Sequence, residues 1–395
     1  MKFVVAGYGS RGDVEPCAAA AVELLRRGHD VRMAVPPNML GFIESAGLAG
    51  VAYGPDSREE MNPASDLFAN LLPKMKNPLS VVPEVVEHVA QVKVEKGATL
   101  AALAEGADLV LASFNEQGVA ANVGEYYGIP TAALHTFPEQ IWSSRWLFSM
   151  MTKVAEDAQR RALGLPEATG PAPLSLQIQA YDELCLPRLE AEWADQDGRR
   201  PFVGALTLEA PTDADEDVLS WIAAGTPPIY FGLGSTPIAT PDDPFAMISA
   251  ACAQLGERVL ICSGRNDVTA SPHPDHVKIV DAMNHSAIFP ACRAVVHHGG
   301  AGTTAAALRA GIPTLILWLW LDQPLWAAAV DHLKVGFGRP FSQTTVETLV
   351  ADLRSVVAPR YVAAAHEVAS QMTKPAESRA KAGDLLEAAT RPHAI

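Results

Sequence analysis

Short apolar runs recur along the chain, and each is followed by a turn and then by a segment whose apolar residues have helical spacing. The run at residues 2–6 is typical of a strand buried on both faces of a parallel sheet. It leads through a glycine-rich turn at 7–13 into a predicted helix over 14–27, which Gly28 ends. A second strand over 31–35 follows, so the chain is predicted to open with a strand–helix–strand unit.

The same alternation returns later in the chain. Residues 57–100 are interrupted by four prolines and predict a mobile, partly helical insertion. The pattern as a whole predicts an α/β protein with two units of similar size, each built on a parallel sheet. Further strands are predicted over 109–112, 131–135, 229–233, 258–263, 277–280, 294–297 and 314–318. Further helices are predicted over 41–47, 117–127 and 245–255, from the turn at 298–304 as far as residue 310, and from about 346 onward.

Length agrees with a division into domains. At about 150 residues per domain, 395 residues predict roughly two to three units. A passage rich in Pro, Asp and Gly at 194–217 marks the expected boundary. The apolar start breaks at glycine and charge, which indicates a buried strand rather than a signal peptide. The most apolar charge-free stretch, 310–321, is shorter than the ~20 residues that cross a bilayer, so we expect a soluble, cytoplasmic protein.

Charge and cysteine content exclude several classes of function. The chain has 45 acidic and 30 basic residues, a net charge of −15, and both halves are acidic. This argues against a nucleic-acid-binding protein, although backbone amides and a few local cations can still bind a small anion. The five cysteines form no C-x-x-C pair, so the sequence predicts neither a zinc site nor a disulfide framework.

The first glycine-rich turn matches G-x-G-x-x-G between a strand and a helix. A dinucleotide site also needs an acidic residue at the end of the second strand, whereas Asp30 lies at its start. An NAD(P) oxidoreductase is therefore disfavoured. The turn carries Ser10, Arg11 and Asp13, which form either an anion-binding and catalytic group or a simple helix start, with Asp13 as its N-cap and Arg11 a surface cation.

A second glycine-rich turn, at 298–304, follows another apolar strand. Its small residues let a ligand approach the backbone, the free amides of the following helix favour a diphosphate, and the imidazole of His298 can donate to it. The alternative is a tight turn with a capping threonine and a packed histidine. Farther on, Asp322 and Gln323 come just after a strand end and suit sugar hydroxyls, or they form a turn before Pro324.

Five segments in order along the chain carry a resemblance: GSRGDVEP at 9–16, RMAVPPN at 32–38, FGLGST at 231–236, HHGGAGTT at 297–304 and WLWLDQP at 318–324. The sequence resembles GT-B glycosyltransferases of the UDP-glycosyltransferase-like family 1, in the actinobacterial branch that acts on glycopeptide antibiotics and mycobacterial glycopeptidolipids. The resemblance implies two Rossmann-like domains facing across a cleft. They would be an acceptor domain at 1–203, a linker at 204–217, a nucleotide-sugar domain at 218–375 and a helix at 376–395 that crosses back to the first domain.

The resemblance also assigns roles to residues. Asp13 matches the general base. The stretch at 280–285 occupies the position of the nucleotide base, without the stacking tryptophan usual in the family, and Val280, Met283 and His285 are its candidate contacts. Asp322 and Gln323 match the pair that holds the donor sugar. The residues that match the donor-diphosphate site are Ser10, Arg11, Ser235, His298, Gly299, Gly300, Gly302 and Thr303.

The implied reaction is an inverting, metal-independent transfer of a hexose or deoxyhexose from a dTDP- or UDP-sugar, with no further cofactor. We expect a hydrophobic acceptor, a glycopeptidolipid or related surface lipid, because apolar residues gather in the first half; the alternative is that they are ordinary core. Competing interpretations are a natural-product tailoring enzyme and a catalytically silent protein of the same fold. A monomer or weak dimer is expected, and peripheral membrane association stays open. The candidate acceptor contacts are Phe68, Leu72, Trp142 and Trp146.

Overall fold

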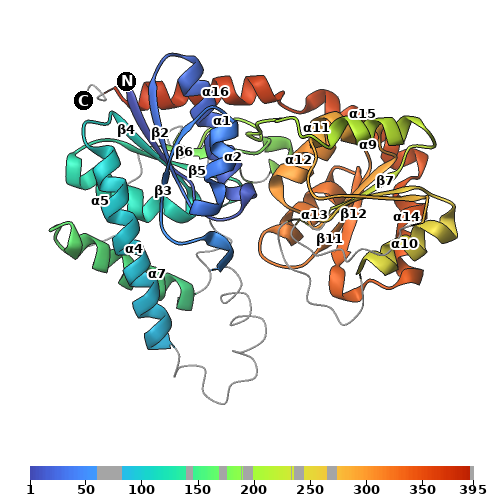
Figure 1. The fold of residues 1–395 in the computed structure, drawn as a ribbon, viewed down its shortest axis with the longest axis horizontal. Helices are drawn as coiled ribbons and strands as arrows, with labels where there is room; N and C mark the ends of the chain where they lie inside the picture. Colours follow the sequence, from blue (N-terminus) through green and yellow to red (C-terminus); the bar gives the residue numbers. More distant parts are fainter. Residues whose placement is uncertain are drawn as a thin grey trace. The chain divides into compact units, whose positions relative to one another are not determined.

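The computed structural model describes residues 1–59, 82–138, 146–168, 176–187, 189, 199–232, 234, 244–264 and 274–391 (Figure 1). The chain forms two compact units. Unit 1 comprises Met1–Ala180, Glu192–Leu208 and Pro375–Ile395, and unit 2 comprises Tyr181–Ala191 and Glu209–Lys374.

Unit 1 contains a six-stranded, all-parallel sheet with the order β3-β2-β1-β4-β5-β6. Its strands are β1 (Lys2–Ala6), β2 (Asp30–Val35), β3 (Ala49–Ala52), β4 (Leu109–Ser113), β5 (Thr131–His135) and β6 (Leu176–Gln179). Its helices are α1 (Arg11–Arg26), α2 (Leu40–Ser45), α4 (Val82–Ala104), α5 (Gln117–Tyr127), α7 (Trp146–Ala162) and α16 (Pro375–Ala389), with 3-10 turns η1 (Pro37–Met39) and η5 (Phe114–Glu116).

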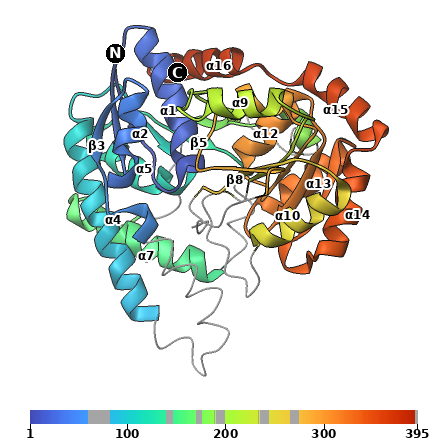
Figure 2. The same cartoon turned by 45° about the vertical axis from the view of Figure 1, so that its right-hand side comes forward.

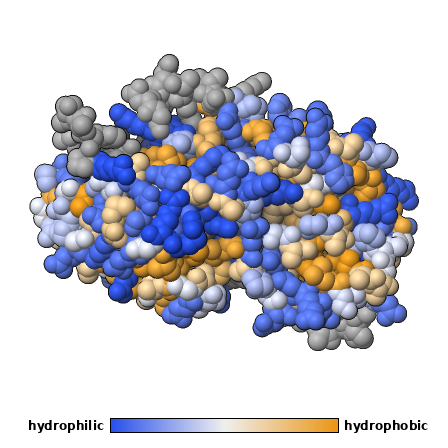
Figure 3. All heavy atoms as spheres, turned by 90° about the horizontal axis from the view of Figure 1, so that it is seen from above, coloured by the Kyte–Doolittle hydropathy of each residue, from blue (hydrophilic) through white to orange (hydrophobic). Residues whose placement is uncertain are grey.

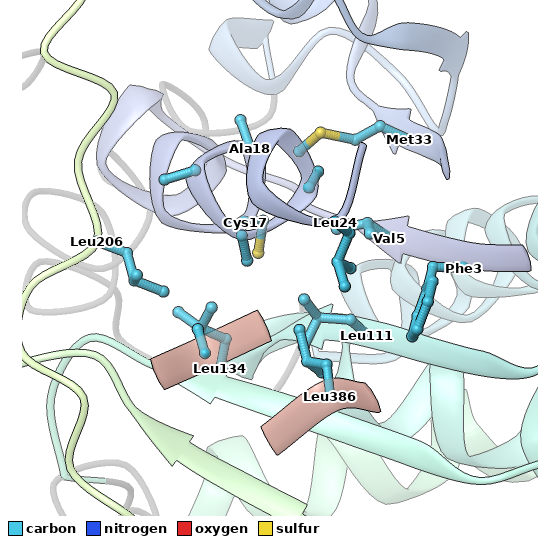
Figure 4. Close-up of a cluster of buried hydrophobic side chains, with 14 of the residues drawn as sticks. Phe3, Val5, Cys17, Ala18, Leu24, Met33, Leu111, Leu134, Leu206 and Leu386 are labelled. Atoms are coloured by element: carbon cyan, nitrogen blue, oxygen red, sulfur yellow. The ribbon is translucent and has the colours of Figure 1, made fainter. Parts of the chain in front are cut away.

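Alternate residues of the unit 1 strands enter two separate cores, because both faces of a parallel sheet are covered by helices. One face packs against α1 and α16, which lie side by side (Figures 1 and 2). In Figure 4, Phe3, Val5, Leu111 and Leu134 of the strands meet Cys17, Ala18 and Leu24 of α1 and Leu386 of α16. The other face packs against α4 and α5.

Helix α16 contacts the rest of unit 1 through ion pairs and a hydrogen bond with Arg27. The Arg27 guanidinium reaches Asp384 at 2.7 Å, Glu387 at 3.1 Å and the carbonyl of Ala380 at 2.8 Å. Gly383 leaves room for that guanidinium, since a β-carbon there would lie 2.6 Å from Arg27 Cζ and the arginine would have to shift.

Unit 2 repeats the architecture, with the sheet order β12-β11-β10-β7-β8-β9 and all strands parallel. Its strands are β7 (Ile229–Gly232), β8 (Val259–Cys262), β9 (Val277–Val280), β10 (Ala294–His297), β11 (Thr314–Trp318) and β12 (Gly336–Pro340). Its helices are α9 (Asp215–Ala223), α10 (Pro244–Leu255), α11 (His285–Ile288), α12 (Ala301–Ala310), α13 (Gln323–His332), α14 (Val346–Val356) and α15 (Pro359–Gln371), with η6 (Glu183–Cys185), η7 (Phe289–Ala291) and η8 (Phe341–Gln343).

The predicted two-sheet α/β fold is confirmed, and the structure corrects several local predictions. The first helix begins at Arg11 rather than at residue 14, since Ser10 is its N-cap. Strands β6 and β12 and helix α13 were not predicted, and α9 begins inside the predicted linker at 204–217. Tyr181–Ala191 belongs to unit 2, where the Tyr181 ring packs edge-on against Trp326 at 5.8 Å, although the predicted boundary places it in the first domain.

On the face drawn in Figure 3, hydrophilic residues predominate and hydrophobic residues lie in smaller patches between them. Among the residues that the structure describes, no helix is both long enough and apolar enough to cross a bilayer.

Candidate functional site

Asp13 lies in the first turn of α1 and is bound to the loop that precedes the helix, here called turn one (residues 7–10). The backbone N–H of Ser10 donates to Asp13 Oδ2 at 2.7 Å, and the Ser10 hydroxyl donates to the same oxygen at 2.9 Å. Gly9 has φ +127°, and a β-carbon there would collide with the carboxylate. Asp13 is therefore the third helical residue, folded back onto the N-cap, and not the N-cap itself.

The environment of Asp13 favours its protonated form more than water does. Burial raises the pKa of Asp13, and the hydrogen bonds from Ser10 oppose that rise without cancelling it. Because both hydrogen bonds from Ser10 go to Oδ2, Oδ1 is the oxygen better placed to accept a further proton. A carboxylate with a raised pKa is a stronger base than an ordinary aspartate, as general base catalysis requires.

The two neighbours predicted to contact donor phosphates are engaged elsewhere. Both donors of Ser10 point at Asp13. Arg11 forms an ion pair with Glu15 at 2.7 Å, and its guanidinium lies 4.9 Å from the centre of the Phe42 ring. Their contact with a diphosphate stays a prediction, and it requires these side chains to rearrange.

Side chains from three other segments hold turn one in place, and no local sequence pattern predicts these contacts. The Ser57 hydroxyl donates to the carbonyl of Gly9 at 2.7 Å, and Asn38 Oδ1 accepts from the Ser57 backbone N–H at 3.1 Å. Asn115 Nδ2 donates to the carbonyl of Tyr8 at 2.7 Å. The segment RMAVPPN contains Asn38, but its role depends on contacts between loops that the sequence does not show.

In unit 2, the loop that joins β10 to α12, here called turn two (residues 298–300), encloses the His298 imidazole between two glycines. A β-carbon at Gly234 would lie 2.5 Å from the ring, and one at Gly300 would lie 2.7 Å from Nε2. Nδ1 lies 3.4 Å from the carbonyl oxygen of Gly232, so in the neutral ring this nitrogen carries the proton and Nε2 is an acceptor. Burial lowers the pKa of His298, and the contact with Gly232 opposes that shift.

Helix α12 begins without a side-chain cap, because its N-cap is Gly300. The first backbone bond of the helix runs from the Thr304 N–H to the Gly300 carbonyl at 2.9 Å, and the Thr304 hydroxyl donates to the same oxygen. The amides of Ala301, Gly302 and Thr303 precede that bond, so helix geometry leaves them without a partner inside the helix. This start of a helix suits an anion.

The structure narrows the predicted role of Gly299. Its N–H donates to Nδ1 of His297 at 3.0 Å, so this amide already has a partner and is not an open donor. The bond fixes the proton of His297 on Nε2, which is buried and has no hydrogen-bond partner among the residues that the structure describes. Burial also places the pKa of His297 well below that of an ordinary histidine, so this ring is neutral at pH 7.

Asp322 and Gln323 lie beside turn two. A β-carbon on Gly299 would meet Gln323 Cβ at 3.0 Å, so the two segments pack backbone to backbone. Gln323 Oε1 accepts from the N–H groups of Leu319 and Trp320 at 2.7 and 3.1 Å, which positions the loop before α13. Asp322 Oδ2 accepts from the Trp326 indole at 3.0 Å. Three predicted groups of unit 2 residues are thus assembled: His298, the start of α12, and the Asp322–Gln323 pair.

The predicted base-contact residues differ in their exposure. Met283 is buried in the core of unit 2, whereas Val280 and His285 are half-buried. His285 stacks on Phe289 with a centroid distance of 4.6 Å, and its Nε2 lies 3.2 Å from the Tyr230 hydroxyl. Only Val280 and His285 of the three retain surface for a ligand.

Five predicted residues have no described side chain. Ser235, Phe68, Leu72 and Trp142 lie outside the described residues, and Trp146 begins α7 without a described side chain. Within the described ranges, no group of three or more His, Cys, Asp or Glu residues is arranged to hold a metal ion.

Comparison with known proteins identifies the family of the chain. Residues 3–141 match the Glycosyltransferase family 28 N-terminal domain, and residues 246–386 match the Erythromycin biosynthesis protein CIII-like, C-terminal domain. The chain is 56% identical to the uncharacterized glycosyltransferase Rv1524 of Mycobacterium tuberculosis, over 99% of both chains. It is 28% identical to sterol 3-beta-glucosyltransferase UGT80B1 of Arabidopsis thaliana, over 93% of this chain and 65% of that one.

A solved structure shows the same fold. The glycosyltransferase VinC, determined in complex with dTDP, superposes with a TM-score of 0.69 at 21% identity, over 99% of this chain and all of VinC. The two parallel six-stranded sheets, the matches to both domain models and the relative from Mycobacterium together show that the chain belongs to the GT-B glycosyltransferases.

Proposed function

We propose that the protein is an inverting, metal-independent hexosyltransferase that moves a sugar from a dTDP- or UDP-activated donor to a hydroxyl group of a hydrophobic acceptor. The observation that carries this proposal is Asp13, which Ser10 and Gly9 hold at the start of α1 and whose pKa is raised by burial. A single carboxylate suffices for an inverting transfer, because the acceptor oxygen attacks the anomeric carbon directly.

In the proposed reaction, the acceptor oxygen forms a bond to the anomeric carbon while the bond from that carbon to the diphosphate oxygen breaks. The acceptor proton passes to Asp13 Oδ1, and the nucleoside diphosphate leaves with the bonding electrons. Alcohols are weak acids, so the proton moves late, when positive charge has already developed on the sugar. The products are a glycoside with inverted configuration and a nucleoside diphosphate.

The leaving group needs stabilisation, which we assign to turn two. The amides of Ala301, Gly302 and Thr303 and the positive end of α12 would face the diphosphate. His298 would add a further donor, Nε2, when the ring takes up a proton. Asp322, half-buried at the start of α13, would accept hydrogen bonds from sugar hydroxyls. The amides, the helix dipole and His298 would supply the charge stabilisation that a divalent cation gives in other glycosyltransferases.

A lipid acceptor is the form of the proposal that we favour. The AVPPN and WLWLDQP segments of this sequence resemble the mycobacterial lipid type, and one relative is named as a sterol glucosyltransferase. A second candidate is the tailoring of a natural product, which the dTDP complex of VinC and the match to the erythromycin-type domain support. The donor nucleotide and sugar (rhamnose, 6-deoxytalose, glucose or another hexose) are to be found by experiment.

The test is a matrix of donors and acceptors read by mass spectrometry. The protein is incubated with dTDP- and UDP-hexoses and with deglycosylated glycopeptidolipids, sterols and polyketide aglycones, with and without EDTA. We expect a product that carries one added hexose, insensitive to EDTA and absent with Asp13→Asn. A thermal shift with NAD(P) but not with dTDP or UDP would contradict the proposal, and no shift with any of them would favour a silent protein of the same fold.

A further inference from the structure

A buried ion pair lies directly beneath turn one, and the proposed reaction does not use it. Lys96 Nζ in α4 is 2.9 Å from Glu116 Oε1, and both side chains are almost fully buried. The other carboxylate oxygen of Glu116 accepts from the Tyr53 hydroxyl at 2.6 Å. The Lys96 ammonium also lies 3.1 Å from the centre of the Tyr8 ring and 5.3 Å from that of Tyr53.

The four residues of this group come from four separate segments. Tyr8 follows β1, Tyr53 follows β3, Glu116 follows β4, and Lys96 reaches them from α4. The C-terminal ends of parallel strands lie on the same side of the sheet, which is where ligands bind in this class of fold. The ion pair therefore connects α4 with the C-terminal ends of the strands, where turn one also lies.

Stability alone is a weak explanation for such a pair. Taking both charges out of water is costly, and apolar residues of similar volume often stabilise a core as well or better. Buried ionic groups are in some systems retained because they specify one arrangement of the groups around them. The Lys96 side chain is also closely fitted, since a β-carbon on Gly54 would lie 2.7 Å from Lys96 Cε.

The contacts of Tyr8 link the pair to the catalytic carboxylate. The Tyr8 hydroxyl donates to the Pro55 carbonyl at 3.1 Å, and the Tyr8 backbone carbonyl accepts from Asn115 Nδ2. Tyr8 is therefore held both at the tip of its ring and at its backbone. Gly9 comes next in the chain and lies so close to the Asp13 carboxylate that it cannot carry a side chain. A movement of Tyr8 must therefore move Gly9 and Ser10, and with them the two hydrogen bonds that hold Asp13.

We propose that Lys96 is a positioning residue for the transfer reaction: its ion pair with Glu116 and its contact with the Tyr8 ring hold turn one so that Ser10 keeps the Asp13 carboxylate in place. This inference rests on the proposed role of Asp13 as the general base. Lys96 itself touches neither the acceptor nor the donor in this account.

The decisive variant removes both charges together, Lys96→Met with Glu116→Gln. It leaves no unpaired buried charge, and the glutamine oxygen can still accept from Tyr53. Without the ammonium over its ring, Tyr8 loosens, so we expect kcat to fall roughly 10- to 100-fold, the scale of a misplacement of about 1 Å. The dissociation constant for dTDP or UDP, measured by calorimetry, stays unchanged.

The pH profile separates positioning from a loss of folded protein. Hydrogen bonds from Ser10 lower the pKa of Asp13, so loosening turn one moves the acid limb of the kcat profile to higher pH. A merely destabilised protein that is still folded, as shown by its circular dichroism and melting temperature, keeps the limb where it is.

A second ion pair in the same unit, which includes an equally buried cation, serves as the control. Arg160 of α7 is as buried as Lys96 and pairs with the half-exposed Glu125 of α5 at 2.7 Å. It also donates to Asn122 and to the carbonyl of Pro166, and none of these three partners belongs to turn one. Arg160→Met with Glu125→Gln should keep kcat and the acid limb. The proposal is overturned if the Lys96→Met, Glu116→Gln variant also keeps its kcat and its acid limb. If Asp13→Asn retains turnover, the proposed function itself is contradicted, and this inference is contradicted with it.

Discussion

Turn one and turn two follow the same plan, and they differ in what occupies the start of the helix. In each, a buried parallel strand ends, a glycine with positive φ redirects the chain, and a helix begins. In turn one the Asp13 carboxylate folds back onto the N-cap Ser10. In turn two the N-cap is Gly300, which has no side chain to cap the first amides of α12.

The difference shows how one backbone motif can serve two kinds of chemistry. A carboxylate that folds back onto the N-cap is held in one position and is partly desolvated. Desolvation raises its pKa and makes it a stronger base. A helix start that is left open keeps its amides and its partial positive charge for an anion from solution.

Replacing Asp13 by asparagine separates its capping role from its chemical role. Asparagine can accept the same hydrogen bonds from Ser10 but cannot take up a proton, so turnover should fall roughly 10²- to 10⁴-fold, the usual contribution of a general base. Donor binding and the melting temperature should change little. The measurement is kcat with the best donor and acceptor, together with calorimetry with the free nucleotide.

Asp215 provides the control, because it repeats the local arrangement in unit 2. Its carboxylate accepts from the Thr212 N–H and hydroxyl at 2.8 and 2.7 Å, three residues apart as in Ser10 and Asp13. Burial pushes the pKa of Asp215 upward, but hydrogen bonds from Asn284 and Thr212 outweigh burial and lower it. Asp215→Asn should leave kcat unchanged, and near-normal turnover in Asp13→Asn would reduce turn one to a helix cap.

The fold was more predictable from sequence than the contacts within the site. The ranges 131–135, 294–297 and 314–318 are observed as β5, β10 and β11, since mainly apolar runs define buried parallel strands. The range 277–280 is observed as β9, an edge strand that is half-buried over most of its length. Strand β12 escaped prediction because its sequence GFGRP contains two glycines and a proline, which an edge position tolerates. Helix α13 escaped because Pro324 suggests a turn, whereas proline is also favoured in a first helical turn.

Side-chain contacts within the site depend on tertiary packing. The motif HHGGAGTT indicates a diphosphate turn, but it does not show that the Gly299 amide is already bonded to His297. The pairing of Lys96 with Glu116, which brings α4 to the end of β4, has no local sequence signal either.

Protonation should act on the two turns in opposite directions. The pKa of His298 is lowered by burial, and its neutral ring offers Nε2 as an acceptor, so donation to a phosphate requires uptake of a proton. A bound diphosphate raises the pKa of His298 again, and donor affinity should therefore increase as pH falls through the pKa of the complex. Turnover, in contrast, should decrease as the pH falls along the acid limb of the kcat profile, because Asp13 becomes protonated.

Calorimetry in buffers with different ionisation enthalpies measures that proton uptake. In His298→Gln the side-chain amide still donates but does not titrate, so the uptake should fall to that of the nucleotide alone. His298→Ala should weaken nucleotide binding about 10- to 100-fold, the cost of a hydrogen bond to a charged group of roughly 1.5–3 kcal/mol. Unchanged affinity in His298→Ala would move the diphosphate away from turn two.

Removing the Ser10 hydroxyl tests whether turn one tunes its own acid. The hydrogen bonds from Ser10 lower the pKa of Asp13, so Ser10→Ala should raise that pKa further and move the acid limb of the kcat profile to higher pH. At a fixed pH on that limb, turnover should fall roughly fivefold, which corresponds to a hydrogen bond of about 1 kcal/mol. An acid limb that does not move would mean that Ser10 only caps the helix.

Two adjacent threonines give the smallest and most local test of turn two. Thr303 is half-exposed at the open start of α12, whereas Thr304 is buried and its hydroxyl donates to the Gly300 carbonyl at 2.9 Å. Thr303→Val should weaken nucleotide binding about three- to tenfold, since it removes a hydroxyl from the anion side of the helix. Thr304→Val should leave binding within about twofold and lower the free energy of unfolding by about 1 kcal/mol, because it removes a bond internal to the helix. Calorimetry and urea unfolding measure both effects, and the reverse pattern would place the anion on the side of α12 that faces the core.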